Sequence, residues 1–189
     1  MRLVTKGEDL LKERRLIIVC GVPGAGKSTF ADRMAKQWSA TSFASEAFTR
    51  ALGDGARDAT GDLTREAIAR AYADMAMAVA DALKVGNLVV AVGAFRSEAL
   101  RHRFRQLAAN VAAVPTTVRI SCAVAEAARR VRVRSAQGER GPTEPVIGQI
   151  DAELARADDI NFVIENNSTI TKFFERTDAF AKGLMEGLS

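Results

Sequence analysis

The chain has 189 residues, of which 48% are hydrophobic and 26% charged, a composition typical of ordinary soluble globular proteins. This length predicts one domain over residues 1–189, large enough to bury a core without a metal or disulfide. Cys20 and Cys122 lie in apolar runs and His102 is the only histidine, which excludes a disulfide scaffold and a cysteine zinc site and disfavours a histidine-based triad. No run approaches the roughly 20 apolar residues of a membrane helix, and the N-terminus is charged rather than signal-like. We therefore expect a cytoplasmic protein without membrane contact, either monomeric or homodimeric.

The formal net charge of +4 makes anionic partners plausible. Arginines gather in two segments, residues 96–105 and 129–140, with acidic residues spread between them. For most of these arginines the simplest interpretation is a solvated helix face.

The first third of the chain predicts two strands, each followed by a helix. Along the chain we expect a polar arm at 1–14, a strand at 16–20, a helix at 28–38, a strand at 41–44, a helix beginning at 45–52 and a loop at 53–62. The first strand is a continuous apolar run ending at glycine, which is typical of a strand buried on both faces.

The rest of the chain continues the alternation of strands and helices. We expect helices at 64–84, from Ser97 through Leu107, at 125–135, at 143–157 and at 171–185, with strands at 88–92, 116–122 and 162–164 and a loop at 137–142. Pro115 is expected to precede its strand, and Ser97 to cap its helix. This pattern predicts an α/β fold with a parallel sheet covered by helices on both faces.

Residues 21–29 read GVPGAGKST, which fits the phosphate-loop pattern G-x-x-x-x-G-K-[ST] between a predicted strand and a predicted helix. Glycines let backbone N–H groups approach phosphate oxygens, and the helix N-terminus favours the same anion. Lys27 can reach the β- and γ-phosphates of ATP, and the Ser28 hydroxyl can ligate Mg²⁺. A purely structural glycine turn is the alternative, which the strand–helix context disfavours. The predicted nucleotide contacts in this loop are Gly21, Gly24, Ala25, Gly26, Lys27, Ser28 and Thr29.

This loop, together with the arginine-rich helix, resembles the P-loop kinases, a group of nucleoside monophosphate kinases, adenylyl-sulfate kinases and zeta-toxin-like phosphotransferases. The resemblance implies a three-layer P-loop NTPase fold whose five-stranded parallel sheet has the order 2-3-1-4-5. It also implies a short arginine-rich lid at about residues 129–142. The Asn-Lys-x-Asp motif of GTPases is absent, which argues against a GTPase, and the family resemblance implies ATP as the nucleotide.

Ser45, Glu46 and Arg50 resemble the Ser-Asp-x-x-Arg pattern that these kinases place near the acceptor hydroxyl, with one additional residue before the arginine. The match implies that Glu46 orients or deprotonates the acceptor and that Arg50 binds it. This chain has Glu where the family has Asp, which changes the reach to the acceptor. The alternative is local, with Ser45 capping a helix and Glu46 stabilising its first turn.

The predicted strand at 88–92 ends in Val92 and Gly93, where many P-loop proteins have an Asp that supports Mg²⁺. Adenylyl-sulfate kinases also lack this Asp, and residues 87–107 resemble their corresponding segment. Mg²⁺ would then be held by Ser28, the phosphates, waters and Glu46. Arg65 lies near a substrate-binding arginine of that family, although Ala67 replaces the matching asparagine.

Arg130 and Arg134 share one helical face before a loop, as in the lids of P-loop kinases, where arginines bind ATP and neutralise the transferring phosphoryl group. The alternative is a solvated basic face, and Arg140 is a further lid candidate. Asn167 lies in the turn after the last predicted strand, where the family contacts adenine. Arg96 and Arg101 would face either the acceptor pocket or solvent.

These features predict an enzyme that transfers the γ-phosphoryl group of Mg-ATP to a hydroxyl or phosphate of a small-molecule acceptor. One alternative is a polynucleotide 5′-hydroxyl kinase, disfavoured because the chain has one Tyr, one Trp and no clear aromatic stacking platform. The other is a non-catalytic ATP-binding regulatory module.

Overall fold

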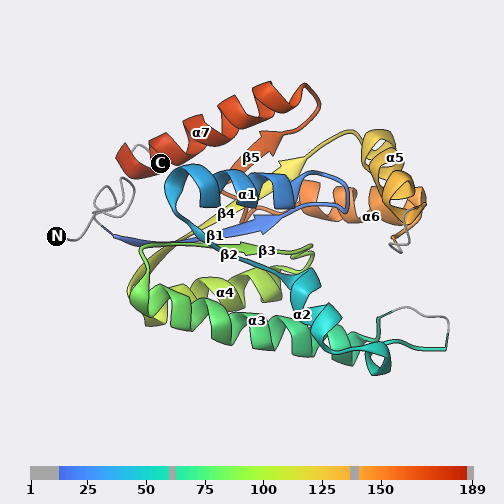
Figure 1. Ribbon diagram of the computed structural model, residues 1–189, viewed down its shortest axis with the longest axis horizontal. Coiled ribbons are helices and arrows are strands. Elements are labelled where there is room, and N and C mark those ends of the chain that lie inside the picture. Colours follow the sequence, from blue (N-terminus) through green and yellow to red (C-terminus); the bar gives the residue numbers. More distant parts are fainter. Residues whose placement is uncertain (1–12, 60–62, 137–140, 187–189) are drawn as a thin grey trace.

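The computed structural model describes residues 13–59, 63–136 and 141–186, and it contains a five-stranded sheet between two layers of helices (Figure 1). The strand order is β2-β3-β1-β4-β5, and every neighbouring pair is parallel. Both the α/β class and this order confirm the sequence-based prediction. The strands are β1 (Arg14–Cys20), β2 (Thr41–Ala44), β3 (Leu88–Val92), β4 (Ala113–Ser121) and β5 (Phe162–Glu165).

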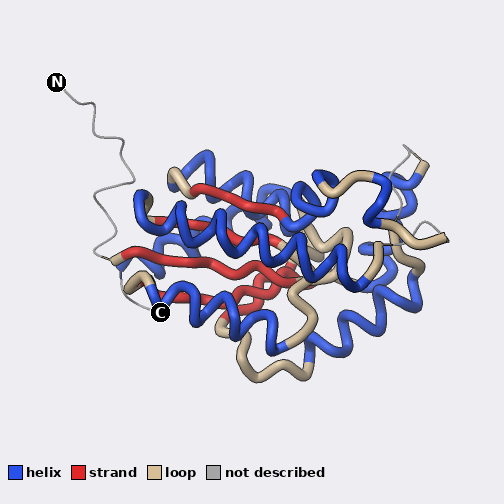
Figure 2. The backbone as a smooth tube through the Cα atoms, turned by 90° about the horizontal axis from the view of Figure 1, so that it is seen from below, coloured by secondary structure: helices blue, strands red, loops and turns tan. Residues whose placement is uncertain are grey.

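Among the described residues, four helices cover the two faces of the sheet, and three others lie near the carboxyl ends of its strands (Figures 1 and 2). On one face lie α1 (Lys27–Trp38) and α7 (Ile170–Glu186), and on the other α3 (Arg65–Val85) and α4 (Glu98–Asn110). Near the carboxyl edge lie α2 (Ser45–Ala51), α5 (Val124–Ser135) and α6 (Glu144–Ala155). This edge of a parallel α/β sheet is where ligands bind in such folds.

The centre of the sheet is the apolar core. Residues 16–20 of β1 are completely buried, and all five residues of β3 are buried as well. Phe30 and Met34 of α1 pack from one side, and Met75 of α3 from the other. Continuous apolar strands are required here because helices cover both faces.

The starts of two helices are capped as their sequences suggest. The Thr64 hydroxyl accepts a hydrogen bond from the Ala67 N–H at 3.1 Å and opens α3. The Ser97 hydroxyl accepts one from the Leu100 N–H at 3.3 Å and opens α4. Such caps satisfy N–H groups that have no partner within the helix.

Two expectations about the chain path are wrong. β4 begins at Ala113, so Pro115 lies inside the strand rather than before it. Proline is accommodated because β5 pairs with β4 only from Val118 onward, leaving one neighbouring strand beside Pro115. The expected loop at 53–62 contains a short 3₁₀ helix, Asp54–Ala56, and an antiparallel bridge joins Arg57 to Leu63.

Cys20 and Cys122 are free, buried thiols. Burial raises the pKa of Cys20 to about 11, so the group is an inert core residue, as expected from its apolar run. Within the described ranges, no helix has the length and apolarity needed to span a bilayer.

Candidate active site

The phosphate loop joins β1 to α1 at the carboxyl edge of the sheet. Gly24 and Gly26 have φ values of +85° and +104°, a backbone region that L side chains rarely adopt. A Cβ atom at Gly26 would collide with the side-chain amide of Asn166, and one at Gly24 with the Ala127 carbonyl. No side chain caps α1, which leaves the N-terminus of this helix available to an anion.

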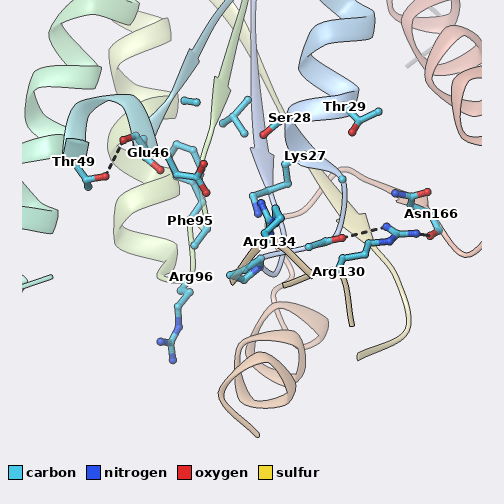
Figure 3. Close-up of a pocket in the computed structure, with 18 of the residues that line it drawn as sticks. Lys27, Ser28, Thr29, Glu46, Thr49, Phe95, Arg96, Arg130, Arg134 and Asn166 are labelled. Atoms are coloured by element: carbon cyan, nitrogen blue, oxygen red, sulfur yellow. Dashed lines mark hydrogen bonds between the residues drawn. The ribbon is translucent and has the colours of Figure 1, made fainter. Parts of the chain in front are cut away.

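A cavity of about 810 Å³ opens beside this loop, a size typical of small-molecule sites (Figure 3). The phosphate loop and α5 form one wall, while α2, α3 and the loop after β3 form the other. Of the sequence-predicted site residues, those lining the cavity are Gly24, Gly26, Lys27, Ser28, Thr29, Glu46, Arg96, Arg130 and Arg134.

Lys27 is the central cation of the cavity. Its Nζ donates a hydrogen bond to the Val22 carbonyl at 2.9 Å. Burial lowers the pKa of Lys27 to about 8, nearby Glu46 acts against this shift, and Arg134 adds to it. The charged form of Lys27 is therefore poorly stabilised in the free protein, and a bound polyphosphate would stabilise it.

Arg130 and Asn166 form hydrogen bonds with the backbone of the phosphate loop. Arg130 donates to the Gly24 carbonyl at 3.1 Å and to the Asn166 carbonyl at 3.4 Å, while its Nε donates to Glu126 at 2.8 Å. The Asn166 amide donates to the Ala25 carbonyl at 2.8 Å. Because the C=O and N–H of a peptide unit point in opposite directions, this contact orients the Gly26 N–H away from Asn166.

Sequence reasoning selected Asn167 at this turn and missed Asn166. Asn167 is exposed, does not line the cavity, and its carbonyl oxygen Oδ1 accepts a hydrogen bond from the Ala123 N–H at 2.7 Å. Asn166 is 6% exposed and lines the cavity. The signal was available, because Asn166 follows buried Ile164 by two residues and strand side chains alternate between faces.

The wall of the cavity opposite the phosphate loop includes Glu46 and Tyr72. Glu46 lines the cavity, and its backbone carbonyl accepts a hydrogen bond from the Thr49 hydroxyl at 3.0 Å. The N-cap of α2 is Ala44, so the local alternative in which Ser45 caps this helix is wrong. The Ser45 side chain instead hydrogen-bonds the Tyr72 hydroxyl.

The loop after β3 adopts an unusual conformation where it meets the cavity. Phe95 has a φ of +44°, and its N–H donates to the Tyr72 hydroxyl at 3.4 Å. A non-glycine residue in this region costs about 1–3 kcal/mol, so surrounding contacts must hold it. Tyr72 and Phe95 both line the cavity, and neither was identified from the sequence.

Arg101 supplies part of that support. The expectation that it would face either the cavity or solvent is wrong. It is 2% exposed and donates to the carbonyls of Phe95 at 2.7 Å and Arg96 at 2.9 Å. It also forms a 2.5 Å ion pair with Asp159. The topology brings Asp159 beside α4, which the local sequence around Arg101 does not reveal.

Arg96 lines the cavity, but its guanidinium is paired with Glu153 of α6 at 2.9 and 2.7 Å. In Figure 3 it points away from Glu46 and Lys27. Arg50 and Arg65 are exposed and do not line the cavity. Gly21 and Ala25 are buried and do not line the cavity, and Arg140 lies outside the described residues.

The end of β3 offers no carboxylate, since Val92 and Gly93 are the residues that line the cavity there. Among the described lining residues, Ser28 and Glu46 provide the oxygen ligands that Mg²⁺ prefers. The described residues contain no cluster of three or more His, Cys, Asp or Glu that could enclose a metal. The donor set therefore fits Mg²⁺ as P-loop sites hold it, with few protein ligands and the rest from phosphates and water.

Several solved kinases share this fold. The APS kinase of Mycobacterium tuberculosis, solved with AMPPNP and APS, superposes with a TM-score of 0.68 at 14% identity, covering 91% of this chain and 98% of that one. Shikimate kinase from Acinetobacter baumannii, solved with shikimate, gives 0.66 at 14% identity, covering 92% and 94%. A chain of the Pnkp1/Rnl/Hen1 RNA repair complex gives 0.64 at 18% identity, covering 76% of this chain and 44% of that one. At these identities the likeness establishes the fold.

Curated proteins offer no match to this sequence. A family model described as an AAA domain matches residues 16–160, from β1 to the residue before Asn161. This span includes the phosphate loop, Glu46, Arg130 and Arg134. The chain belongs to this AAA-domain family, and its fold is that of the P-loop kinases.

Proposed function

We propose that this protein is an ATP-dependent kinase that transfers the γ-phosphoryl group to a hydroxyl or phosphate of a small molecule. The observation that carries the proposal is the cavity shared by the phosphate-loop Lys27 and the Glu46 carboxylate. Lys27 is suited to hold a triphosphate, and Glu46 is suited to face a nucleophile beside that triphosphate. A regulatory ATP-binding module would need only Lys27.

In the proposed reaction, the acceptor oxygen attacks the γ-phosphorus and the bond to the β,γ-bridging oxygen breaks, so that ADP leaves. For a hydroxyl acceptor, Glu46 accepts the proton released as the new P–O bond forms. Lys27 holds the β- and γ-phosphates, and the amides at the start of α1 bind the same anion. Bound Mg²⁺, held by Ser28 and supported by Glu46, would neutralise phosphate charge.

Arg130 and Arg134 would complete the site as a lid. Both line the cavity from α5, and Arg134 lies close enough to Lys27 to lower its pKa. Phosphoryl transfer depends mainly on positioning and charge stabilisation, which fixed cations supply. Arg130 has a second role here, because its contact with the Gly24 carbonyl shapes the phosphate loop.

The test is ADP release from Mg-ATP, measured with pooled hydroxyl-bearing metabolites, nucleosides and antibiotics. One pool should raise turnover well above background, and Lys27→Ala should abolish the response. Glu46→Gln should retain ATP binding but lower kcat about 10²–10⁴-fold, the usual contribution of a general base. Tight ATP binding without any acceptor-dependent product would favour the regulatory module, and failure to bind ATP would exclude both.

The polynucleotide kinase alternative has one supporting observation, the fold shared with a chain of an RNA repair complex. The described lining of the cavity contains two aromatic residues, Tyr72 and Phe95, and both are buried. They pack edge-on against each other and against Phe104, so they offer no exposed faces for stacked bases. A small-molecule kinase is therefore better supported than a polynucleotide kinase.

A further inference from the structure

The two walls of the cavity differ in charge. The wall formed by the phosphate loop and α5 contributes four cations, Lys27, Arg129, Arg130 and Arg134, of which Arg129 and Arg130 share the Glu126 carboxylate. On the opposite wall, from α2, α3 and the loop after β3, the charged residues among those described are Glu46 and Arg96. A bound triphosphate would be matched by the first wall, which leaves the second to select the acceptor.

The acceptor wall is mainly apolar and hydroxyl-bearing. Leu63, Ile68 and Leu100 line it with aliphatic side chains, beside the hydroxyls of Thr49 and Tyr72. Ile68 is 39% exposed, so it presents apolar surface that a bound molecule would cover. This lining suits a ligand with an apolar body and a few polar groups.

The cation on this wall is already neutralised. Glu153 binds the Arg96 guanidinium through two hydrogen bonds of 2.9 and 2.7 Å, a bidentate geometry that is strong and specific. An anionic acceptor would have to compete with Glu153 for the Nε and Nη2 donors of Arg96. The carboxylate of Glu153, which lies on α6 and does not line the cavity, thus offsets the charge that Arg96 brings to this wall.

Two further features disfavour an anion on this wall. The Glu46 carboxylate lines the cavity opposite the phosphate loop, and it would repel a negative group placed beside it. The N-terminus of α4, the remaining anion-binding feature, is capped by the Ser97 hydroxyl and has Glu98 in its first turn.

We propose that the acceptor is an electrically neutral, partly apolar hydroxyl compound, and that the Arg96–Glu153 pair disfavours anionic acceptors. This inference rests on the kinase function proposed above. It disfavours nucleoside monophosphates and adenylyl sulfate as acceptors. It also implies that the group that accepts the phosphoryl is a hydroxyl rather than a phosphate.

The test compares matched alcohols that differ in charge, bound to the full-length protein with Mg²⁺ and AMPPNP. The pairs are para-hydroxymethyl benzamide with para-hydroxymethyl benzoate, and thymidine with thymidine monophosphate. Calorimetry should show the neutral member of each pair binding at least about tenfold more tightly. Tighter binding of the anionic members, or no binding by any neutral member, would overturn the proposal.

A variant pair isolates the role of Glu153. Glu153→Gln releases Arg96 and should improve binding of the anionic members about tenfold relative to the neutral ones. Asp81→Asn changes the net charge equally at an exposed residue of α3 that does not line the cavity, and it should leave the preference unchanged. An unchanged preference in Glu153→Gln would contradict the gating role of the pair.

Binding and turnover separate the two proposals. If neutral alcohols bind preferentially but none yields ADP above the Lys27→Ala background, the kinase function fails while the charge selectivity stands. If ADP forms faster with the anionic members, the kinase function stands and the neutral-acceptor inference fails.

Discussion

At the scale of single residues, Lys27 shows how the free site is prepared for its ligand. Burial lowers its pKa to about 8, from the ordinary lysine value of 10.5 that the unfolded chain would have. The folded protein thus binds fewer protons than the unfolded chain between pH 8 and 10.5, so this group makes the free protein more stable as pH rises through that range. Bound phosphates would favour the charged form of Lys27 and so raise its pKa again.

This shift predicts a pH-dependent affinity for Mg-ATP. Below pH 8 most Lys27 is charged and affinity should be nearly constant, whereas above it binding must take up a proton. The dissociation constant should then rise about tenfold per pH unit, which calorimetry between pH 7.5 and 9.5 can measure. Lys27→Arg serves as the control, because arginine stays charged, and its weaker binding should not change over this range. A constant affinity for the native protein up to pH 9.5 would contradict the assignment.

At the scale of elements, arginine–carboxylate pairs join α6 and the connection after it to the rest of the fold. Arg96 pairs with Glu153, and Arg119 with Asp151 at 2.7 Å. Asp159 binds Arg101, and burial, which would raise the pKa of Asp159, is outweighed by the arginine hydrogen bonds that lower it to about 2. These pairs fix the loop after β3 against the β4–β5 side of the sheet.

We predict that Arg101→Met both destabilises the fold and impairs the acceptor side. Asp159 would remain buried with only Arg105 as a partner, so the free energy of unfolding should fall by about 3 kcal/mol. Loss of the contacts to the Phe95 and Arg96 carbonyls should raise the KM for the acceptor several-fold while the KM for ATP stays unchanged.

Urea unfolding and steady-state kinetics check this prediction. The double variant Arg101→Met with Asp159→Asn should recover at least half of the lost stability, because no unpaired charge remains. A loss below about 1 kcal/mol, or an equal rise in both KM values, would show that Arg101 does not hold this loop in the proposed way.

At the scale of the whole molecule, the net charge of +4 is less informative than its distribution. Arg101 and Arg119 form ion pairs inside the fold, whereas Lys27, Arg129, Arg130 and Arg134 line the cavity. A small-molecule kinase needs positive charge at the triphosphate, whereas a polynucleotide kinase needs a groove that follows a phosphate backbone.

We therefore predict weak binding to single-stranded oligonucleotides. The dissociation constant at physiological salt should exceed about 10⁻⁴ M, measured by fluorescence anisotropy with a labelled oligonucleotide. Micromolar binding that weakens steeply with salt would instead support the polynucleotide alternative, because each neutralised phosphate of a single strand contributes about −0.7 to the slope of log K against log salt. ATP binding to the same sample confirms that the protein is folded.

The fold was predictable because its signals are local. Apolar runs such as residues 16–20 and 88–92 could only be strands buried on both faces, and both lie where expected. The start of β4 was misplaced because Pro115 suggests a boundary, whereas the tolerance for proline depends on where β5 begins. The position of β5 cannot be read from the residues around Pro115, because β5 is distant in the chain.

The candidate site was predictable in part for the same reason. Glycine spacing and the following Lys27 and Ser28 form one continuous motif, and the structure places Gly24, Gly26, Lys27 and Ser28 at the cavity. The acceptor side was less accessible, because Tyr72 and Phe95 are ordinary apolar positions until tertiary contacts turn them toward the site. Arg50 and Arg65 match family positions in the chain but lie outside the lining.

What the sequence determined by itself was the chemistry that depends on neighbouring residues: a strand, a glycine turn, a lysine and a helix N-terminus that together can hold a phosphate chain. What only the tertiary structure decided was the role of each arginine. Arg96 and Arg101 lie five residues apart, yet one borders the cavity with Glu153 bound to it and the other is buried with Asp159. A charge acts on its nearest partner in space, and these partners lie more than fifty residues away along the chain.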